Sequence, residues 1–485
     1  MMREKYKGFI SKYGYFFEWY YLLVIFVYIL TLASDLVRPG VIASALLILV
    51  WVEVFLSDPK GFKGFSIQDW LVFSYFVYNI LSVIWLTLGG LPASVFLGEF
   101  VVSVLPLGFY FAGRLCGERL AGFYEKFTLA VLVVGIVGIL LYIAAPQFYL
   151  DYSFRYLFIS KADAPTMRVR MNSVVGCTLL GFLGTAGMMS GAYFLKTNPV
   201  KAHSTIPSER ANRAGSGRTS SEGKGNCPVS RSQTCEWRTS KAAGSSSRGI
   251  SNAQAAPAAV SAQGNWADTG KETSRVKSSR IFGILSIVIC LIVAVMSNQR
   301  SVLVSAILVM IYINYLLFFK LDLIPKKYFY AELCLIAAVF VLLCIIKFDV
   351  ILKFWWRLAS LPGAVSERSE QWIAAINNMY STWLGNGLGA NGHRALGIEG
   401  THVIADGGLI KLYCEEGILG FSLFLYIVIL AVKKGLSNVR EYYVELGILA
   451  LVFLQSIGSN IIAFQLATPI FWFAIGRIQA PEGAV

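Results

Sequence analysis

The sequence has few charged side chains and few groups that exchange protons near neutral pH. Only 14% of its 485 residues are Asp, Glu, Lys or Arg, and it contains three histidines. Its eight cysteines show no metal-binding or redox spacing, and Cys290, Cys334 and Cys344 lie inside apolar runs, where cysteine behaves as a small hydrophobe. The sequence therefore indicates neither a disulfide framework nor a cysteine metal site.

Apolar residues dominate instead. They make up 56% of the chain, the mean hydropathy is +0.62, and many apolar runs reach the roughly 17–25 residues that cross a bilayer as a helix. The basic N-terminus leads into "YYLLVIFVYILTLA", which we interpret as a first span and not as a cleavable signal peptide. The composition predicts an all-α, polytopic membrane protein.

About twelve transmembrane helices are expected. The last two share one apolar stretch that is interrupted near "SIGSN", so eleven or thirteen are alternatives. The predicted ranges are 18–36, 41–57, 70–88, 97–113, 127–145, 173–195, 281–298, 301–319, 328–347, 409–432, 443–459 and 461–477.

The distribution of Lys and Arg predicts an orientation with the N-terminus inside. With that choice, most basic residues fall in even-numbered, cytoplasmic connections, as the positive-inside rule requires. The net charge is +14, and a surplus of nine lies between Lys196 and Arg280. We interpret this surplus as cytoplasmic-loop charge, so the chain is not expected to bind nucleic acid.

Five segments follow from these runs. Residues 1–195 carry spans 1–6, 281–348 carry spans 7–9, and 409–485 carry spans 10–12. The segment 196–280 nearly lacks Leu, Ile and Phe and is expected to be disordered. A dispensable insertion, a locally mistranslated reading frame and a regulatory or interaction tail are all open for it, and we assign it no function. Residues 349–408 form a large outer (periplasmic) loop, far longer than a connector and predicted to contain short helices.

The stretch "THVIADGG" at 401–408 places two proton-handling groups just before an apolar run. If it is helical, His402 and Asp406 lie four residues apart and share a face. Either side chain could take a proton from a hydroxyl. The alternative makes Asp406 the N-cap of the next helix and His402 an ordinary loop residue.

Four arginines are predicted on the outer side, against the positive-inside trend. Arg168 and Arg170 precede the sixth span, Arg300 begins the eighth, and Arg368 lies in the large loop. A guanidinium group binds phosphate oxygens through two parallel hydrogen bonds and stays charged at any relevant pH. These arginines are candidate ligands of a pyrophosphate at the head of a lipid, although a snorkelling arginine is an ordinary feature of a helix end.

The segment "GNGLGANGH" at 385–393 has four glycines, whose amides could surround an anion. It matches neither the Walker nor the dinucleotide pattern, and a flexible loop is the preferred interpretation. For Glu415 and Glu416, expected near the membrane interface, structural and catalytic roles remain open.

Three of these patterns resemble the bacterial family of O-antigen polymerases and O-antigen ligases, which build surface polysaccharide on undecaprenyl pyrophosphate. They are "SNQRSVLVSAI", "RSEQWIAAINNMYSTWLGNGLG" and "DGGLIKLYCEEGILGFSLF", and they cover roughly residues 281–435. The earlier spans match only in hydropathy and placement.

The resemblance implies a metal-independent, inverting sugar transfer without a cofactor on the outer face of the cytoplasmic membrane. An acceptor hydroxyl attacks the anomeric carbon of an undecaprenyl-pyrophosphate-linked oligosaccharide. Arg300 and Arg368 would bind the departing pyrophosphate, with Arg170 and Arg168 as further candidates. Candidate partners besides this substrate and the bilayer are a chain-length regulator and a flippase.

One departure from the family separates polymerase from ligase. The ligases resembled here carry a histidine eleven residues before the closing glycine, and the equivalent position before Gly417 is Asp406. The expected base is therefore Asp406, with His402 second, and a polymerase is favoured over a ligase. A flippase for the same lipid-linked sugar is the alternative from another class; it should carry ionisable groups in mid-span, and the sequence shows few.

Overall fold

The computed structural model describes residues 10, 13–32, 39–57, 65–148, 170–196, 266–321, 325–346, 361–480 and four isolated positions between 352 and 359. Within these residues the protein is helical and contains no strand, as the sequence predicts. The chain divides into two compact units, residues 1–197 together with 277–485, and residues 198–276. The first unit contains all the predicted spans and all the candidate site residues.

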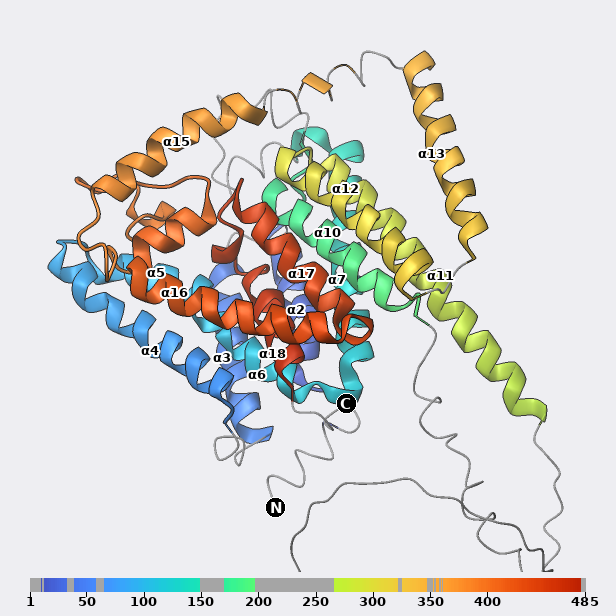
Figure 1. Ribbon diagram of the computed structural model, residues 1–485, viewed down its shortest axis with the longest axis horizontal. Coiled ribbons are helices and arrows are strands. Elements are labelled where there is room, and N and C mark those ends of the chain that lie inside the picture. The colour runs from blue at the N-terminus through green and yellow to red at the C-terminus, as the bar shows by residue number, and fades with distance from the viewer. Residues whose placement is uncertain are drawn as a thin grey trace, which may run out of the picture. The chain divides into compact units, whose positions relative to one another are not determined.

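The first unit is a bundle of helices whose order along the chain is shown in Figure 1. The α-helices are α2 (Phe16–Leu30), α3 (Pro39–Ser57), α4 (Ile67–Leu88), α5 (Ala93–Ser103), α6 (Gly108–Leu115), α7 (Leu120–Ala144), α10 (Cys177–Tyr193), α11 (Trp266–Met296), α12 (Arg300–Tyr315), α13 (Lys326–Ile346), α15 (Leu361–Asn377), α16 (Gly408–Ser437), α17 (Val439–Ser456) and α18 (Thr468–Gln479). Shorter turns are η2 (Leu105–Leu107), η3 (Gly117–Arg119), η7 (Leu316–Lys320), η8 (His393–Ala395) and η9 (Ile461–Ala463).

Among the residues that the structure describes, seven helical stretches are long and apolar enough to cross a membrane. They are Pro39–Ser57, Ile67–Leu88, Ala93–Leu115, Leu120–Ala144, Ser279–Met296, Arg300–Lys320 and Gly408–Ser437. Each of the twelve expected ranges overlaps a helix. The chain is a membrane protein with several spans, and the number twelve stays a prediction.

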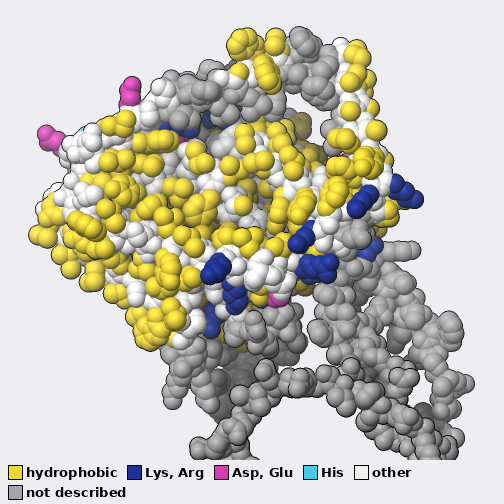
Figure 2. All heavy atoms as spheres, in the orientation of Figure 1, with side chains coloured by type: hydrophobic (Ala, Val, Ile, Leu, Met, Phe, Trp, Pro, Cys, Tyr) yellow, Lys and Arg dark blue, Asp and Glu magenta, His cyan; other side chains and the backbone are white. Residues whose placement is uncertain are grey.

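The outer surface of the bundle is apolar. Large side chains such as Ile48, Phe26 and Ile143 are about half exposed or more, and Figure 2 shows hydrophobic side chains over most of the visible bundle. A soluble protein rarely exposes so much contiguous apolar surface, whereas lipid solvates it. The same figure shows Lys and Arg side chains gathered towards one edge.

The core is built where small residues let helices approach closely. Helix α6 packs on α18 because Gly113 and Gly476 lie at the contact; a Cβ on either glycine would clash with the other helix's backbone. Small residues at such crossings are typical of membrane helix pairs. Next to this contact, the rings of Phe123 and Phe473 stack with centroids 3.7 Å apart.

The segment expected to be disordered, 196–280, lies mostly outside the described residues. Its last part, from Trp266, forms the beginning of α11, and the expected disorder of the segment stays a prediction. In the large loop, "EQWIAAI" lies within α15, which agrees with the expected short helix.

Candidate functional site

Asp406 lies in an irregular segment just before α16, at the end of the bundle where α15 covers the start of that helix (Figure 1). Its carboxylate Oδ2 is 2.7 Å from Nη2 of Arg368 on α15. Trp372, one turn later on α15, donates its indole N–H to the Asp406 carbonyl oxygen at 2.7 Å. Helix α15 therefore holds both the side chain and the backbone of Asp406.

Two interpretations of this stretch are wrong. Residues 401–407 are not helical, so His402 and Asp406 do not share a helical face. The N-cap of α16 is Gly407, without a side-chain hydrogen bond, so Asp406 does not cap the helix. Gly407 has φ +122°, and a Cβ there would lie 2.6 Å from the Trp372 indole nitrogen.

The electrostatic surroundings of Asp406 bring further predicted residues to the site. Partial burial raises the pKa of its carboxyl above the usual range, and the Arg368 guanidinium opposes this rise. Positive charge on His393 and Arg170 also acts to lower the Asp406 pKa. Arg170 thus lies within electrostatic reach of Asp406, while Arg168 lies outside the described residues. His393 was missed in the sequence, because only the fold brings it near Asp406.

The backbone at Arg300 reaches the same end of the bundle. Arg300 is the first residue of α12, and Ser301 packs on Gly458, where a Cβ would lie 3.1 Å from the Ser301 Cβ and 3.8 Å from Arg368 Nη1. The amide of Met171, next to Arg170, donates to the Met296 carbonyl at 2.9 Å. The ends of α11 and α12 therefore lie beside the Arg368–Asp406 pair.

His402, the second candidate base, is held through its backbone. Its carbonyl oxygen accepts a hydrogen bond of 2.7 Å from the Asn391 side-chain amide, and its side chain is half-buried. The Asp406 carboxylate, by contrast, is the one paired with a guanidinium.

The backbone amides of the glycine-rich segment 385–392 are engaged within the protein and are not free to bind an anion. Each of its amide N–H groups is directed at an acceptor within the protein. Two of them, from Gly389 and Asn391, go to the carboxylate of Glu415. The acidic group that these amides bind is therefore the side chain of Glu415, and not a separate anion.

This segment also supplies hydrogen-bond partners to the backbone at a break in α16. Gly417 has φ +63° and ψ −170°, which interrupts the helix inside a predicted span. Asn386 N donates to the Cys414 carbonyl and Gly387 N to the Glu415 carbonyl, at 2.8 and 2.9 Å. Irregular backbone at membrane depth is tolerated where protein satisfies its polar groups, and the glycine segment provides these partners.

A charged cluster lies buried beside the break. We call Glu99, Lys411, Glu415 and Glu416 the Lys411 cluster; all four are at most 5% exposed. Lys411 Nζ contacts Glu99 Oε1 at 2.5 Å and Glu415 Oε2 at 3.3 Å. Both glutamates are buried in the bundle within the first turns of α16. Their expected place near the membrane interface stays a prediction, as does the expectation of few charges in mid-span.

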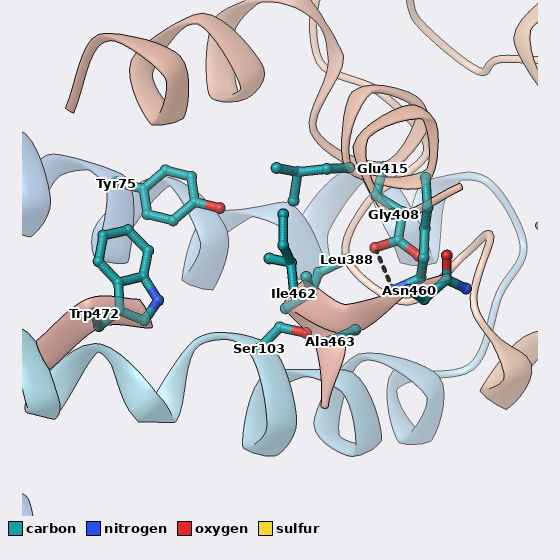
Figure 3. A pocket seen from close by; sticks show the side chains of 11 residues that line it. Tyr75, Ser103, Leu388, Gly408, Glu415, Asn460, Ile462, Ala463 and Trp472 are labelled. Carbon is teal, nitrogen blue, oxygen red and sulfur yellow. Dashed lines mark ion pairs between the residues drawn. The ribbon is translucent and has the colours of Figure 1, made fainter. Parts of the chain in front are cut away.

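A small cavity adjoins this cluster (Figure 3). Its walls include Tyr75, Lys411, Glu415, Asn460 and Trp472, and the space open to the centre of a water molecule is about 20 Å³. That is room for about one water, far too little for a sugar. The cavity is therefore too small to be a substrate pocket.

A much larger apolar groove of about 760 Å³ runs between α12, α16 and α17. It begins near Ser305 and Leu454, each four residues from the contact between Ser301 and Gly458. It extends along α12 to Tyr315 and Lys320. The groove therefore leads away from the Arg368–Asp406 end along the length of the span.

In comparisons with known proteins, no family model matches the chain and no curated protein matches it. The family resemblance of the sequence motifs therefore remains a hypothesis.

Proposed function

We propose that the protein is a membrane glycosyltransferase that polymerises undecaprenyl-pyrophosphate-linked oligosaccharide units into O-antigen, capsule or exopolysaccharide. The observation that carries this proposal is the pair of Arg368 and Asp406, 2.7 Å apart and each about one third exposed, at one end of an apolar bundle. A guanidinium and a carboxylate are the two groups that the reaction needs at one place.

The chemistry assigns each group one task. The acceptor hydroxyl oxygen forms a bond to the anomeric carbon, and the bond from that carbon to the pyrophosphate oxygen breaks. The electron pair of the broken bond leaves with the pyrophosphate, whose growing charge Arg368, Arg300 and Arg170 stabilise. The hydroxyl proton passes to the Asp406 carboxylate.

The ion pair also suggests how substrate binding prepares the base. Arg368 is shared with Asp406 before a substrate arrives. A pyrophosphate that draws this guanidinium away removes an interaction that lowers the Asp406 pKa. Asp406 then becomes a stronger base at the moment when the donor is bound.

The apolar groove is an argument for a substrate that carries a hydrocarbon tail. Its lining is almost entirely apolar, and its end near Ser305 lies one helical turn from Ser301, beside the candidate pyrophosphate site. A polyprenyl chain in the groove would place its head group near Arg368. The cluster of Lys and Arg away from this end favours an orientation with the site on the outer face of the cytoplasmic membrane.

A ligase that transfers the polymer to lipid A core is the nearest alternative and would use the same groups. The resembled ligases have a histidine eleven residues before the glycine that corresponds to Gly417. In this chain that position is Asp406, which favours the polymerase. A flippase for the lipid-linked sugar is favoured by a different observation. The broken helix α16 and the Lys411 cluster within the spans are features of transporters.

Deletion of the gene followed by gel analysis of surface polysaccharide separates these functions. Loss of a polymerase leaves a single repeat unit attached to its acceptor, and this is the expected result. Loss of a ligase leaves full-length polymer on the lipid carrier, and loss of a flippase leaves repeat units inside. Either of the last two patterns would refute the polymerase.

A further inference from the structure

We propose that Asn391 and Glu415 are positioning residues, through which the buried Lys411 cluster fixes the backbone that carries Asp406. This inference deepens the proposed function, since it assumes that Asp406 is the reacting carboxylate. Neither residue is assigned a contact with substrate.

The first link lies inside the membrane-spanning part. Lys411 on α16 bridges Glu99 on α5 and Glu415 on its own helix. Ser103 adds a hydroxyl hydrogen bond of 2.9 Å to Glu99. Because separating a buried ion pair leaves uncompensated charge, and because Lys411 also donates a hydrogen bond to Glu99, this bridge fixes the first two turns of α16 against α5.

The second link joins the cluster to the large loop. Glu415 Oε1 accepts the backbone N–H of Asn391 at 3.1 Å, and the Gly389 amide also donates to this carboxylate. The Asn391 side chain is in turn oriented by Asn386, whose Nδ2 donates to its Oδ1 at 2.9 Å. Asn391 is 1% exposed, so no solvent competes for these bonds.

The third link reaches the reacting segment. Asn391 Nδ2 donates to the His402 carbonyl at 2.7 Å, and the Asn391 carbonyl accepts the Ile404 N–H at 2.9 Å. From the other side, Asn460 Nδ2 donates to the Ile404 carbonyl at 2.8 Å. The backbone two residues before Asp406 is thereby held from both sides.

These bonds offer a reason why charged side chains are buried within two candidate spans beside the large loop. An apolar cluster at the same place would pack α16 on α5 but would offer no oriented acceptor to the loop. A displacement of about 1 Å at a reacting group can cost about 100-fold in rate. The Lys411 cluster thus helps to position the Asp406 carboxylate, although it makes no contact with it.

Hydrogen exchange of the purified protein in lipid nanodiscs tests this without any assay of activity. Asn391→Ala and Glu415→Ala should accelerate amide exchange within residues 401–407 about 10-fold, the effect of losing roughly one net hydrogen bond. Exchange in residues 420–436 should stay within about twofold of wild type. Glu415→Gln keeps an acceptor for the Asn391 amide and should restore part of the protection.

The matched control is Asp69→Asn, which disrupts another buried ion pair, with Arg114, and should leave exchange in residues 401–407 unchanged. Equal exchange in 401–407 in wild type and Asn391→Ala would overturn the inference. So would an equal acceleration by Asp69→Asn. If Glu415→Ala does not accumulate, Asn391→Ala, which keeps the whole cluster, carries the test.

Polymer synthesis in proteoliposomes separates this inference from the proposed function. Asn391→Ala should lower kcat about 10- to 100-fold with KM within about threefold of wild type, and leave the acidic limb of the pH profile in place. Wild-type kcat despite faster exchange would refute the positioning role. Wild-type activity of Asp406→Asn would instead refute the proposed function while leaving the exchange result standing.

Discussion

Two regions of the bundle bury charged side chains, and they use them differently. In one region the ion pairs join helix ends to each other: Asp69 on α4 pairs with Arg114 on α6, and Arg477 on α18 with Glu441 on α17. In the other, the Lys411 cluster joins two helices to a loop, and that loop ends at the partly exposed pair of Asp406 and Arg368.

The difference indicates which charges serve structure and which serve chemistry. Asp69 is fully buried and has both carboxylate oxygens occupied, by Tyr110 and Arg114, so it can offer nothing to a substrate. Asp406 is about one third exposed and held by one guanidinium. Exposure beside an oriented partner, and not burial, marks the candidate site.

The largest expected effect comes from removing the charge on each of these two aspartates. Asp406→Asn should lower polymer synthesis about 10²–10⁴-fold, the usual contribution of a general base, with normal amounts of protein in the membrane. Asp69→Asn should reduce the amount of folded protein with no specific loss per molecule. The comparison fails if Asp406→Asn acts only through protein level, measured by blotting the membrane fraction.

The next effect concerns the break in α16. Gly385 has φ +78°, and a Cβ there would overlap the Glu415 carbonyl, so Gly385→Ala should reduce the free energy of unfolding by about 2–5 kcal/mol through strain and overpacking. Gly397 has φ +84° but no atom within 4 Å of its Cβ position. Gly397→Ala should cost only about 1–2 kcal/mol. Thermal unfolding in detergent measures both, and equal shifts would contradict the role of the glycine segment.

A pH profile sharpens the assignment of the base. Burial raises the Asp406 pKa and Arg368 lowers it, so Arg368→Ala should raise it further. Since the base acts in its ionised form, the acidic limb of kcat should move to higher pH in Arg368→Ala and less in Arg368→Lys. A limb that stays in place, or moves to lower pH, would show that another group is the base.

The smallest expected effect tests the groove. Ala450 lines it on α17 and is exposed, so Ala450→Trp should obstruct it and raise KM for a lipid-linked donor about 10-fold or less. Ile429 on α16 is 58% exposed and does not line the groove, so Ile429→Trp is the matched control. Equal KM values for the two variants would remove the groove from the substrate path.

Much of the fold could be predicted because span hydrophobicity is a local property. The apolar runs predict helices that the structure contains, including the break near Ser456 before α18. The interruption at Gly417 could not be predicted, since a glycine inside an apolar run is ordinary in membrane helices. Only the fold shows that the segment 385–392 supplies the missing hydrogen bonds.

The candidate site could be predicted in part, because residue type is also a local property of the sequence. The residue types of Asp406 and Arg368, together with the family resemblance, indicate a base and a pyrophosphate ligand, and the structure places the two side chains 2.7 Å apart. Their support from Trp372, Asn391 and Asn460 depends on amides, an indole and backbone carbonyls, which carry no distinctive sequence spacing. The i, i+4 spacing of Lys411 and Glu415 indicates an ion pair on one face of a helix, whereas its burial is visible only in the fold.

The proposed function requires that Asp406 and the arginines around it transfer a glycosyl chain from a lipid pyrophosphate. The most direct measurement incubates the purified protein, in proteoliposomes, with synthetic undecaprenyl-pyrophosphate-linked repeat units and follows free undecaprenyl pyrophosphate together with polymer length. We expect the two products to rise together with wild-type protein and neither to appear with Asp406→Asn. Lipid pyrophosphate release without chain extension, or equal products from both proteins, would refute the transfer.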